Sequence, residues 1–253
     1  MSLSSAPEPV SPDPVTSKSR GGSSRSALRM LVGLVVGSVG LVTGIWVLTR
    51  LLANSEPSYQ GRILDEWRAQ LTNSNPDTAK AALVVVQNLI IPGLTNQMFH
   101  DTYDSSVRLF VIEKLDSLPG VNVDYVSADS RRIQAVKDLA SLGSLAKPGI
   151  PALLEAVRGS DESLCAEAAT ALAEIHADAD LAVPALLTKI TDSQGHGRPE
   201  VVDALGEYGT AAKVAVPKLI GMLQDWSSKE IRFAVPRALK KIDPEAAAKA
   251  GVR

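Results

Sequence analysis

The pattern of hydrophobic and polar positions divides the chain into an uncharged run and a longer region of helical periodicity. Residues 30–49 form twenty consecutive positions without a charge, between Arg29 and Arg50. At 1.5 Å per residue, a helix of this length spans about 30 Å, the thickness of the hydrocarbon core of a bilayer. The run predicts a transmembrane helix within residues 27–52, with lipid contact over residues 30–49. Residues 1–26, rich in Ser, Pro and Gly, predict a disordered tail.

A cleaved signal peptide is the main alternative for this run. Its apolar core would span about 7–15 residues and end at a small-residue cleavage site. The run is longer than that, and Leu51-Leu52-Ala53 does not provide such a site. We therefore expect an uncleaved anchor, a single-pass helix in the inner (cytoplasmic) membrane, followed by a linker over residues 53–60.

Basic residues on either side of the helix indicate its orientation. Four precede it and three follow it within about 20 residues: Lys18, Arg20, Arg25 and Arg29, against Arg50, Arg62 and Arg68. Because Lys and Arg favour the cytoplasmic side of a membrane, this small excess favours a cytoplasmic N-terminus. The C-terminal region would then lie outside the cytoplasm.

Four glycines of the run are spaced by 4, 3 and 4 residues and so share one helix face: Gly33, Gly37, Gly40 and Gly44. Small residues on one face let two helix backbones approach closely, which predicts self-association. The alternative is that glycine is simply common in membrane helices.

Beyond residue 60, the strongest pattern is an internal repeat of 33 residues. Pro151-Ala-Leu-Leu recurs as Pro184-Ala-Leu-Leu and as Pro217-Lys-Leu-Ile. Proline is typical of the first helical turn, where its missing N–H would be unsatisfied in any case. Each copy is therefore expected to begin a helix at its proline.

A second helix is expected in every copy. Its apolar columns repeat at steps of 33, 33 and 34 residues: Ala135/Ala168/Val201/Val235, Leu139/Leu172/Leu205/Leu239 and Leu142/Ile175/Tyr208/Ile242. Gly143 and Gly209 follow this helix, where a left-handed C-terminal cap favours glycine. His176 holds the equivalent place in the copy between them.

The region before residue 150 follows the same scheme more loosely. Helical patterns at about 62–72, 77–90, 105–118 and 129–143 predict two further pairs, with Leu118–Asp129 as a loop insertion. Each pair buries its second apolar side only by stacking on a neighbour. We therefore expect an all-α solenoid over residues 61–253.

The repeats resemble a known family. Residues 150–176 (IPALLEAVRGSDESLCAEAATALAEIH) and 216–247 (VPKLIGMLQDWSSKEIRFAVPRALKKIDPEAA) are similar to bacterial HEAT repeats, of the short type also found in phycobilin-lyase-like proteins. Residues 59–71 (YQGRILDEWRAQL) resemble the lead-in of membrane-anchored HEAT proteins. The resemblance implies a right-handed α-solenoid of about five HEAT-like helix pairs, preceded by a single transmembrane helix. It departs from the family at Cys165, where an arginine is usual.

Composition adds exclusions. The single cysteine, Cys165, rules out an intramolecular disulfide and a CxxC-type zinc site, and three histidines offer little for a metal centre. No P-loop, GxGxxG, GxSxG, HExxH or EF-hand spacing is present. His176, Asp178 and Asp180 share one short segment, which a solvated turn explains better than a metal site. We expect no enzyme activity and no catalytic, cofactor-binding or metal-binding residue.

Charge is distributed unevenly along the repeats. Residues 150–209 carry a local charge of −8 and residues 210–253 a local charge of +5. Five carboxylates fall on the polar faces of the second helices: Glu167, Glu174, Glu200, Asp203 and Glu207. Because second helices usually line the concave side of HEAT solenoids, the resemblance implies a groove that passes from acidic to basic. Its carboxylates would attract a basic protein partner. The alternative is a solvated charged face, and nucleic acid is not expected without a continuous basic track.

Together these patterns predict a membrane-anchored HEAT-repeat scaffold that binds protein partners through the solenoid surface. Two alternatives stay open. One is an enzyme or enzyme subunit of the bilin-lyase type, to which the repeats are similar. The other is a passive structural protein of the envelope.

Overall fold

The computed structural model describes residues 40, 42–48, 57–121, 123, 125–192, 198–223 and 229–252. The chain separates into two compact units, Met1–Leu52 and Ala53–Arg253. In the first unit, residues 42–48 are helical. The predicted tail, Gly33 and Gly37, and residues 53–56 of the predicted linker lie outside the described residues.

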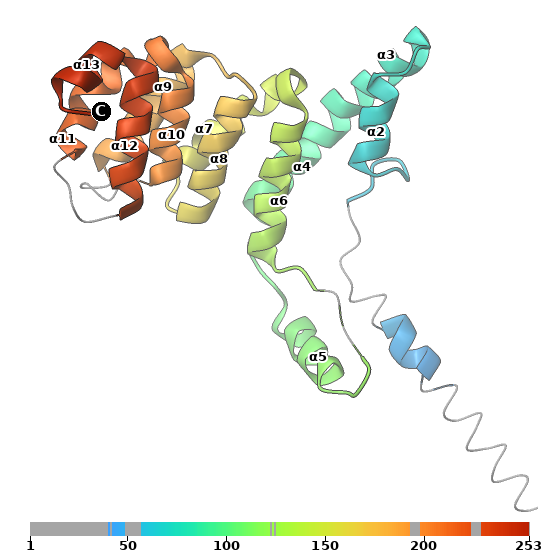
Figure 1. Ribbon diagram of the computed structural model, residues 1–253. Helices are drawn as coiled ribbons and strands as arrows, with labels where there is room; N and C mark the ends of the chain where they lie inside the picture. The colour runs from blue at the N-terminus through green and yellow to red at the C-terminus, as the bar shows by residue number, and fades with distance from the viewer. Residues whose placement is uncertain are drawn as a thin grey trace, which may run out of the picture. The chain divides into compact units, whose positions relative to one another are not determined.

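The second unit is helical throughout its described secondary structure, apart from an isolated bridge between Tyr59 and Arg62 (Figure 1). The prediction of an all-α fold is confirmed for these residues. The elements are α2 (Leu64–Leu71), α3 (Pro76–Val85), the π-helical turn η1 (Val86–Ile90), α4 (Ile91–His100), α5 (Ser106–Asp116), α6 (Ala128–Ser141), the 3-10 helix η2 (Gly143–Gly149), α7 (Ile150–Arg158), α8 (Glu162–Glu174), α9 (Ala179–Asp192), α10 (Pro199–Glu207), the 3-10 helix η3 (Gly209–Ala215), α11 (Val216–Met222), α12 (Lys229–Ile242) and α13 (Pro244–Lys249).

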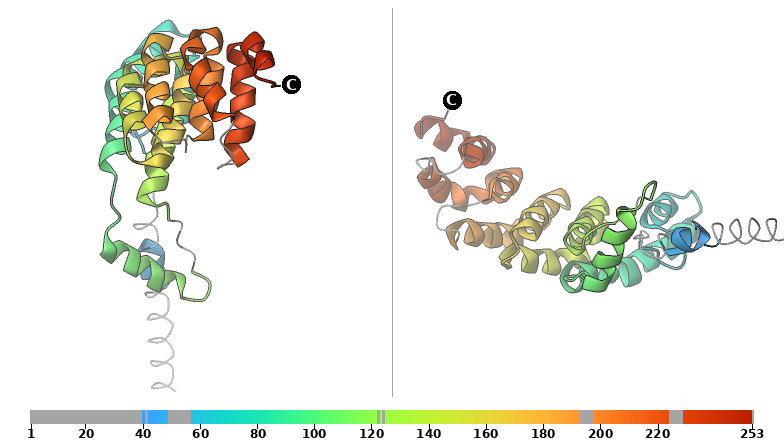
Figure 2. Two further views of the ribbon diagram at one scale, coloured as in Figure 1. Left: turned by 90° about the vertical axis from the view of Figure 1, so that its left-hand side faces the viewer. Right: turned by 90° about the horizontal axis from the view of Figure 1, so that it is seen from below.

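The helices of the repeats pack both on neighbours in sequence and on helices that are next but one along the chain. Consecutive helices form the pairs α2 with α3, α7 with α8, α9 with α10 and α11 with α12. The second helices also pack side by side in chain order, α6 on α8, α8 on α10 and α10 on α12 (Figure 2). The short α13 then covers the end of α12.

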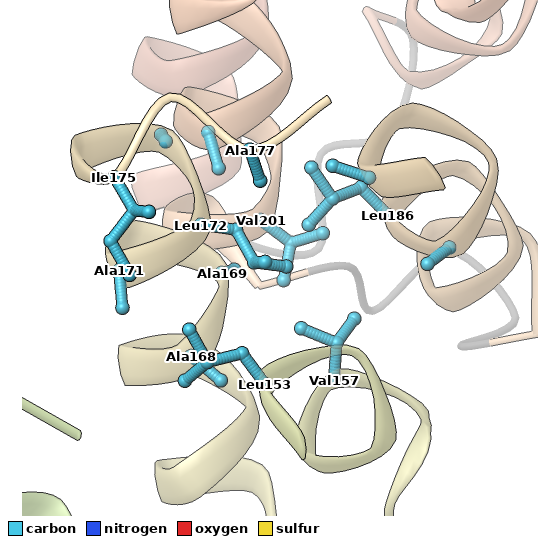
Figure 3. Close-up of a cluster of buried hydrophobic side chains, with 14 of the residues drawn as sticks. Leu153, Val157, Ala168, Ala169, Ala171, Leu172, Ile175, Ala177, Leu186 and Val201 are labelled. Carbon is cyan, nitrogen blue, oxygen red and sulfur yellow. The ribbon is translucent and has the colours of Figure 1, made fainter. Parts of the chain in front are cut away.

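The repeating apolar columns form the core of this unit. The leucines of the central column, Leu139, Leu172, Leu205 and Leu239, have no exposed surface. Figure 3 shows Leu172 from α8 beside Val201 from α10, above Leu153 and Val157 of α7. In the third column Tyr208 is half-buried, and its hydroxyl donates to the carbonyl of Leu172 at 3.0 Å. The register of the repeat is therefore as expected.

The caps between the second helices and the next copy are left-handed. Gly143 and Gly209 have φ angles of 55° and 52°, and His176 adopts the same conformation with φ of 54°. The N–H of His176 donates to Ala173 and the N–H of Ala177 to Leu172, each at 3.1 Å. This pair of bonds satisfies carbonyls at the end of α8.

The starts of the first helices differ among the copies. Pro151 and Pro217 lie in the first turn of α7 and α11, as expected. Pro184 instead lies inside α9, because that helix already begins at Ala179. The Asp178 carbonyl accepts the N–H groups of the third and fourth residues after it, which starts the α9 helix early.

The expected pairing is wrong at one place. α3, η1 and α4 follow one another as a continuous helix from Pro76 to His100, beyond the end expected at residue 90. α6 packs chiefly on α4, whereas the helix expected at 105–118 is α5, which is not the partner of α6. Residues 101–127 therefore form an insertion that contains α5 as well as the expected loop.

Among the described residues, the helix Pro76–His100 is long and apolar enough to cross a membrane by length and composition. Its side chains at Val86, Ile90, Leu94 and Met98 have no exposed surface and belong to the core. Packing on α6 therefore accounts for these apolar positions.

Candidate partner-binding site

The five predicted site residues lie on two second helices that pack on each other. α8 carries Glu167 and Glu174, and α10 carries Glu200, Asp203 and Glu207. The opposite face of each helix carries the buried columns, so helical periodicity directs these carboxylates away from the core. Each of the five side chains is exposed or half-buried.

A hollow with a volume of about 420 Å³ lies between these two helices. It is lined by Thr170, Ala173, Glu174, His176, Glu200, Asp203, Ala204 and Glu207. Four of the predicted carboxylates thus share one concavity, and Glu167 lies outside its lining. His176, which has a left-handed conformation, is also part of the lining.

Three of the five carboxylates form ion pairs with the neighbouring second helix. Both oxygens of Asp203 accept bonds from the guanidinium of Arg237, and the pKa of Arg237 is raised by this partner. The Glu207 carboxylate accepts from Lys241 Nζ at 2.6 Å, and Glu167 lies 4.0 Å from Lys137 Nζ. The expected change from acidic to basic surface therefore occurs between α10 and α12, where carboxylates of α10 form ion pairs with cations of α12.

Sequence reasoning placed these residues on one face but missed their pairing. Asp203 and Arg237 occupy the same column of adjacent copies, and so do Glu207 and Lys241. Equivalent positions of stacked second helices lie side by side. Opposite charges at equivalent positions of adjacent copies would therefore have predicted these ion pairs. Glu174 and Glu200 have no ion pair among the described residues.

The hollow can accept hydrogen bonds from cationic groups. Four carboxylates line it, and two cations, on Arg237 and Lys241, compensate only Asp203 and Glu207. Glu174 and Glu200 leave a surplus of negative charge, and their carboxylates can each accept from an ammonium or a guanidinium. The site is therefore complementary to Lys or Arg side chains.

A second hollow of about 420 Å³ is lined by residues of α2, of the segment before it and of α6. Its lining residues are Pro57, Tyr59, Leu64, Asp65, Arg68, Gln134, Lys137, Asp138 and Ser141. Asp65 pairs with Arg68 at 3.2 Å, and Gln134 donates to Asp138 at 2.9 Å. Cations and carboxylates are balanced here, in contrast to the hollow between α8 and α10.

Cys165 is packed in the core rather than presented to solvent. Its thiol has no exposed surface and donates to the carbonyl of Val157 at 3.3 Å. Burial raises the pKa of the Cys165 thiol, which leaves it protonated and unreactive at neutral pH. In the equivalent place of the preceding copy, Arg132 donates to the Met98 carbonyl at 2.9 Å. At this position of the repeat, both side chains therefore donate a hydrogen bond to a backbone carbonyl, and the Cys165 thiol is the smaller donor.

His176 and Asp178 lie exposed on the loop between α8 and α9, and Asp180 lies exposed in the first turn of α9. Within the parts of the chain that the structure describes, no group of three or more His, Cys, Asp or Glu side chains is placed to hold a metal ion. His196 lies outside the described residues.

No protein-family model matches the chain, and no curated protein is significantly similar to it.

Proposed function

We propose that the chain is a membrane-anchored scaffold of HEAT-like repeats that binds a basic protein partner in the hollow between α8 and α10. The observation that carries the proposal is the surplus negative charge of Glu174 and Glu200 within a concavity. A rigid core beneath both helices would hold these carboxylates in place when a partner arrives.

A right-handed solenoid of about five pairs is the architecture that we propose for the second unit. Its support is the ordered packing of α6, α8, α10 and α12 and the buried columns at steps of 33 and 34 residues. A stack of this kind exposes a long surface relative to its core, as scaffolds that bind other proteins do.

Membrane attachment through residues 30–49 is the second part of the proposal. Its support is the uncharged sequence of this run and the exposure of Val42, Trp46 and Val47 on a helical segment. A Cβ atom added at Gly40 or Gly44 would meet nothing within 4 Å. The helix is thus open to a second helix at these two glycines, which agrees with self-association. We propose a cytoplasmic N-terminus from the excess of basic residues before the run.

The partner is expected to carry clustered Lys or Arg residues. Charge complementarity would act mainly by speeding the encounter, because the potential of several carboxylates adds over the surface. An exposed ion pair contributes only about 0.2–1 kcal/mol. Binding therefore requires several such contacts and should weaken as salt is raised.

The test is capture of partners from detergent extracts by the full chain and by the double variant Glu174→Lys, Glu200→Lys. The matched control is Glu155→Lys, Glu245→Lys, which makes the same change of net charge at exposed positions on α7 and α13. We expect the first variant to lose salt-sensitive partners and the control to keep them. Equal capture by both variants would show that the hollow is only a solvated surface.

A further inference from the structure

The insertion between α4 and α6 exposes an unusual concentration of apolar side chains. Of the twelve large hydrophobic side chains that the structure describes as exposed in the second unit, six lie in residues 102–127. They are Tyr103, Val107, Leu109, Phe110, Leu118 and Val126. Val107 is 72% exposed and Phe110 58% exposed, one helical turn apart on α5. In contrast, the exposed large hydrophobic side chains of the repeats are scattered along the sequence.

In this insertion, α5 lies apart from the helical pairs (Figure 1). Its buried residues Ile112 and Leu115 do not belong to the core of the repeats. The guanidinium of Arg131 pairs with Asp101 and Asp104, and the Asp104 carboxylate also accepts the N–H of Ala128 at 2.8 Å. Polar bonds therefore fasten both ends of the insertion to α6, while its apolar face stays uncovered.

Chain length keeps the start of the second unit near a bilayer, if residues 30–49 form the anchor proposed above. Eight residues separate Leu48 from Pro57. A fully extended chain covers at most about 3.3–3.6 Å per residue, so Pro57, the first described residue of the second unit, lies within about 30 Å of Leu48. Such a short tether keeps the effective concentration of lipid high, which allows even a weak contact to be populated.

We propose that the α5 insertion lies against the bilayer surface, with Val107 and Phe110 inserted among the lipids. The insertion carries five acidic and only two basic residues over 101–127, so attraction to anionic headgroups would not drive this contact. Burial of apolar surface drives it instead, and neutral lipids suffice. Lys114 lies 5.4 Å from the ring centre of Phe110, where its ammonium can reach the headgroups while Phe110 enters the apolar layer.

The test labels one position at a time with an environment-sensitive fluorophore in the full chain, reconstituted into phosphatidylcholine vesicles. The native thiol is removed by Cys165→Ala, and a cysteine is introduced by Phe110→Cys or, as the control, Val214→Cys. Val214 is 64% exposed on η3, within the repeats. Flotation of the vesicles measures anchoring separately. Lipids that carry a nitroxide quencher then report contact of the label with the bilayer.

We expect the protein to float, with a blue-shifted and strongly quenched label at position 110 and no quenching at position 214. Flotation with equal quenching at both positions would overturn the proposal for α5 and leave the anchor standing. Failure to float would overturn both. A blue shift at position 110 that depends on protein concentration in detergent, without quenching by lipid, would assign the face to a second copy and also overturn the proposal.

Discussion

Arg131 at the start of α6 and Asp101 at the end of α4 form a two-fold ion pair across the base of the insertion. Arg131 Nε lies 2.5 Å from one carboxylate oxygen and Nη2 lies 2.6 Å from the other. The side chains are only 17% and 25% exposed, so water screens the pair little. Arg131 also donates to the Val126 carbonyl at 2.7 Å. The Arg131 guanidinium therefore joins the segment that leads into the insertion to the segment that leads out of it.

Replacement of Arg131 should loosen the insertion. Arg131→Ala leaves Asp101 and Asp104 without their cation, and we expect a loss of about 1.5–3 kcal/mol, the range for hydrogen bonds to charged groups. Limited proteolysis should cut within residues 102–127 before it cuts the repeats. Arg68→Ala is the control, because its pair with Asp65 is exposed and should contribute less than about 1 kcal/mol. Equal protease sensitivity of the two variants would contradict this account.

The cap of α8 offers a stabilising change. His176 holds a left-handed conformation with φ of 54°, which costs a residue with a Cβ atom roughly 1 kcal/mol relative to glycine. We therefore expect His176→Gly to raise the free energy of unfolding by about 0.5–1 kcal/mol. Urea denaturation of the detergent-solubilised chain, followed by circular dichroism, measures the change.

The matched control for this cap is Gly143→Ala. An added Cβ atom at Gly143 would meet nothing within 4 Å, so only the backbone conformation opposes it. We expect it to lower the stability by about 1 kcal/mol. Stabilisation by both substitutions, or by neither, would mean that the left-handed conformation has no influence here.

The sequence predicts the repeats well because packing imposes the same demand on each copy. Leu172 and Leu205 recur at the same place and are both fully buried. The glycine cap was recognisable for the same reason, since a left-handed residue ends each second helix from α6 to α10. Periodicity alone does not tell which helix partners another. It correctly indicated a helix at 105–118, but the partner of α6 is α4. The apolar pattern shows which face of a helix is buried, and it does not show which other helix covers that face.

The candidate site could be predicted only in part. Helical spacing placed Glu174 and Glu200 on the polar face, and the structure brings both into one hollow. The ion pair between Asp203 and Arg237 depends on how adjacent copies stack. It could be predicted only by comparing equivalent positions of adjacent copies, and not from the spacing within one helix. As a result, Glu174 and Glu200 are better probes of partner binding than Asp203 and Glu207.

The close packing of α10 on α12 depends on Gly206. A Cβ atom added there would lie 3.0 Å from the Cα atom of Ala238, which cannot move without displacing the backbone. We expect Gly206→Val to cost about 1–3 kcal/mol by forcing the helices apart. In contrast, Gly221→Ala on α11 meets nothing within 4 Å and should stabilise by up to about 1 kcal/mol through helix propensity. Thermal unfolding of the two variants should shift in opposite directions.

Asp161 should make the stability of the repeats depend on pH. Its carboxylate caps α8 by accepting the N–H of Leu164 at 3.0 Å and pairs with Arg132 at 2.7 Å, and both interactions lower its pKa. A carboxyl with a lower pKa in the folded state binds fewer protons there than in the unfolded chain. Its stabilisation is therefore complete above the unfolded pKa of about 3.9 and is lost as the pH falls through the folded value.

The variant Asp161→Asn isolates this contribution, because asparagine keeps the capping oxygen but carries no charge. At pH 7 we expect the variant to be less stable by about 0.5–1 kcal/mol, a modest value because the Asp161 side chain is 36% exposed and partly screened. Between pH 5 and pH 2 the stabilities of the two proteins should converge, as the wild-type carboxylate becomes protonated. Urea denaturation at several pH values measures the difference. A difference that stays constant over this range would show that the charge of Asp161 does not stabilise the fold, and that only its capping oxygen matters.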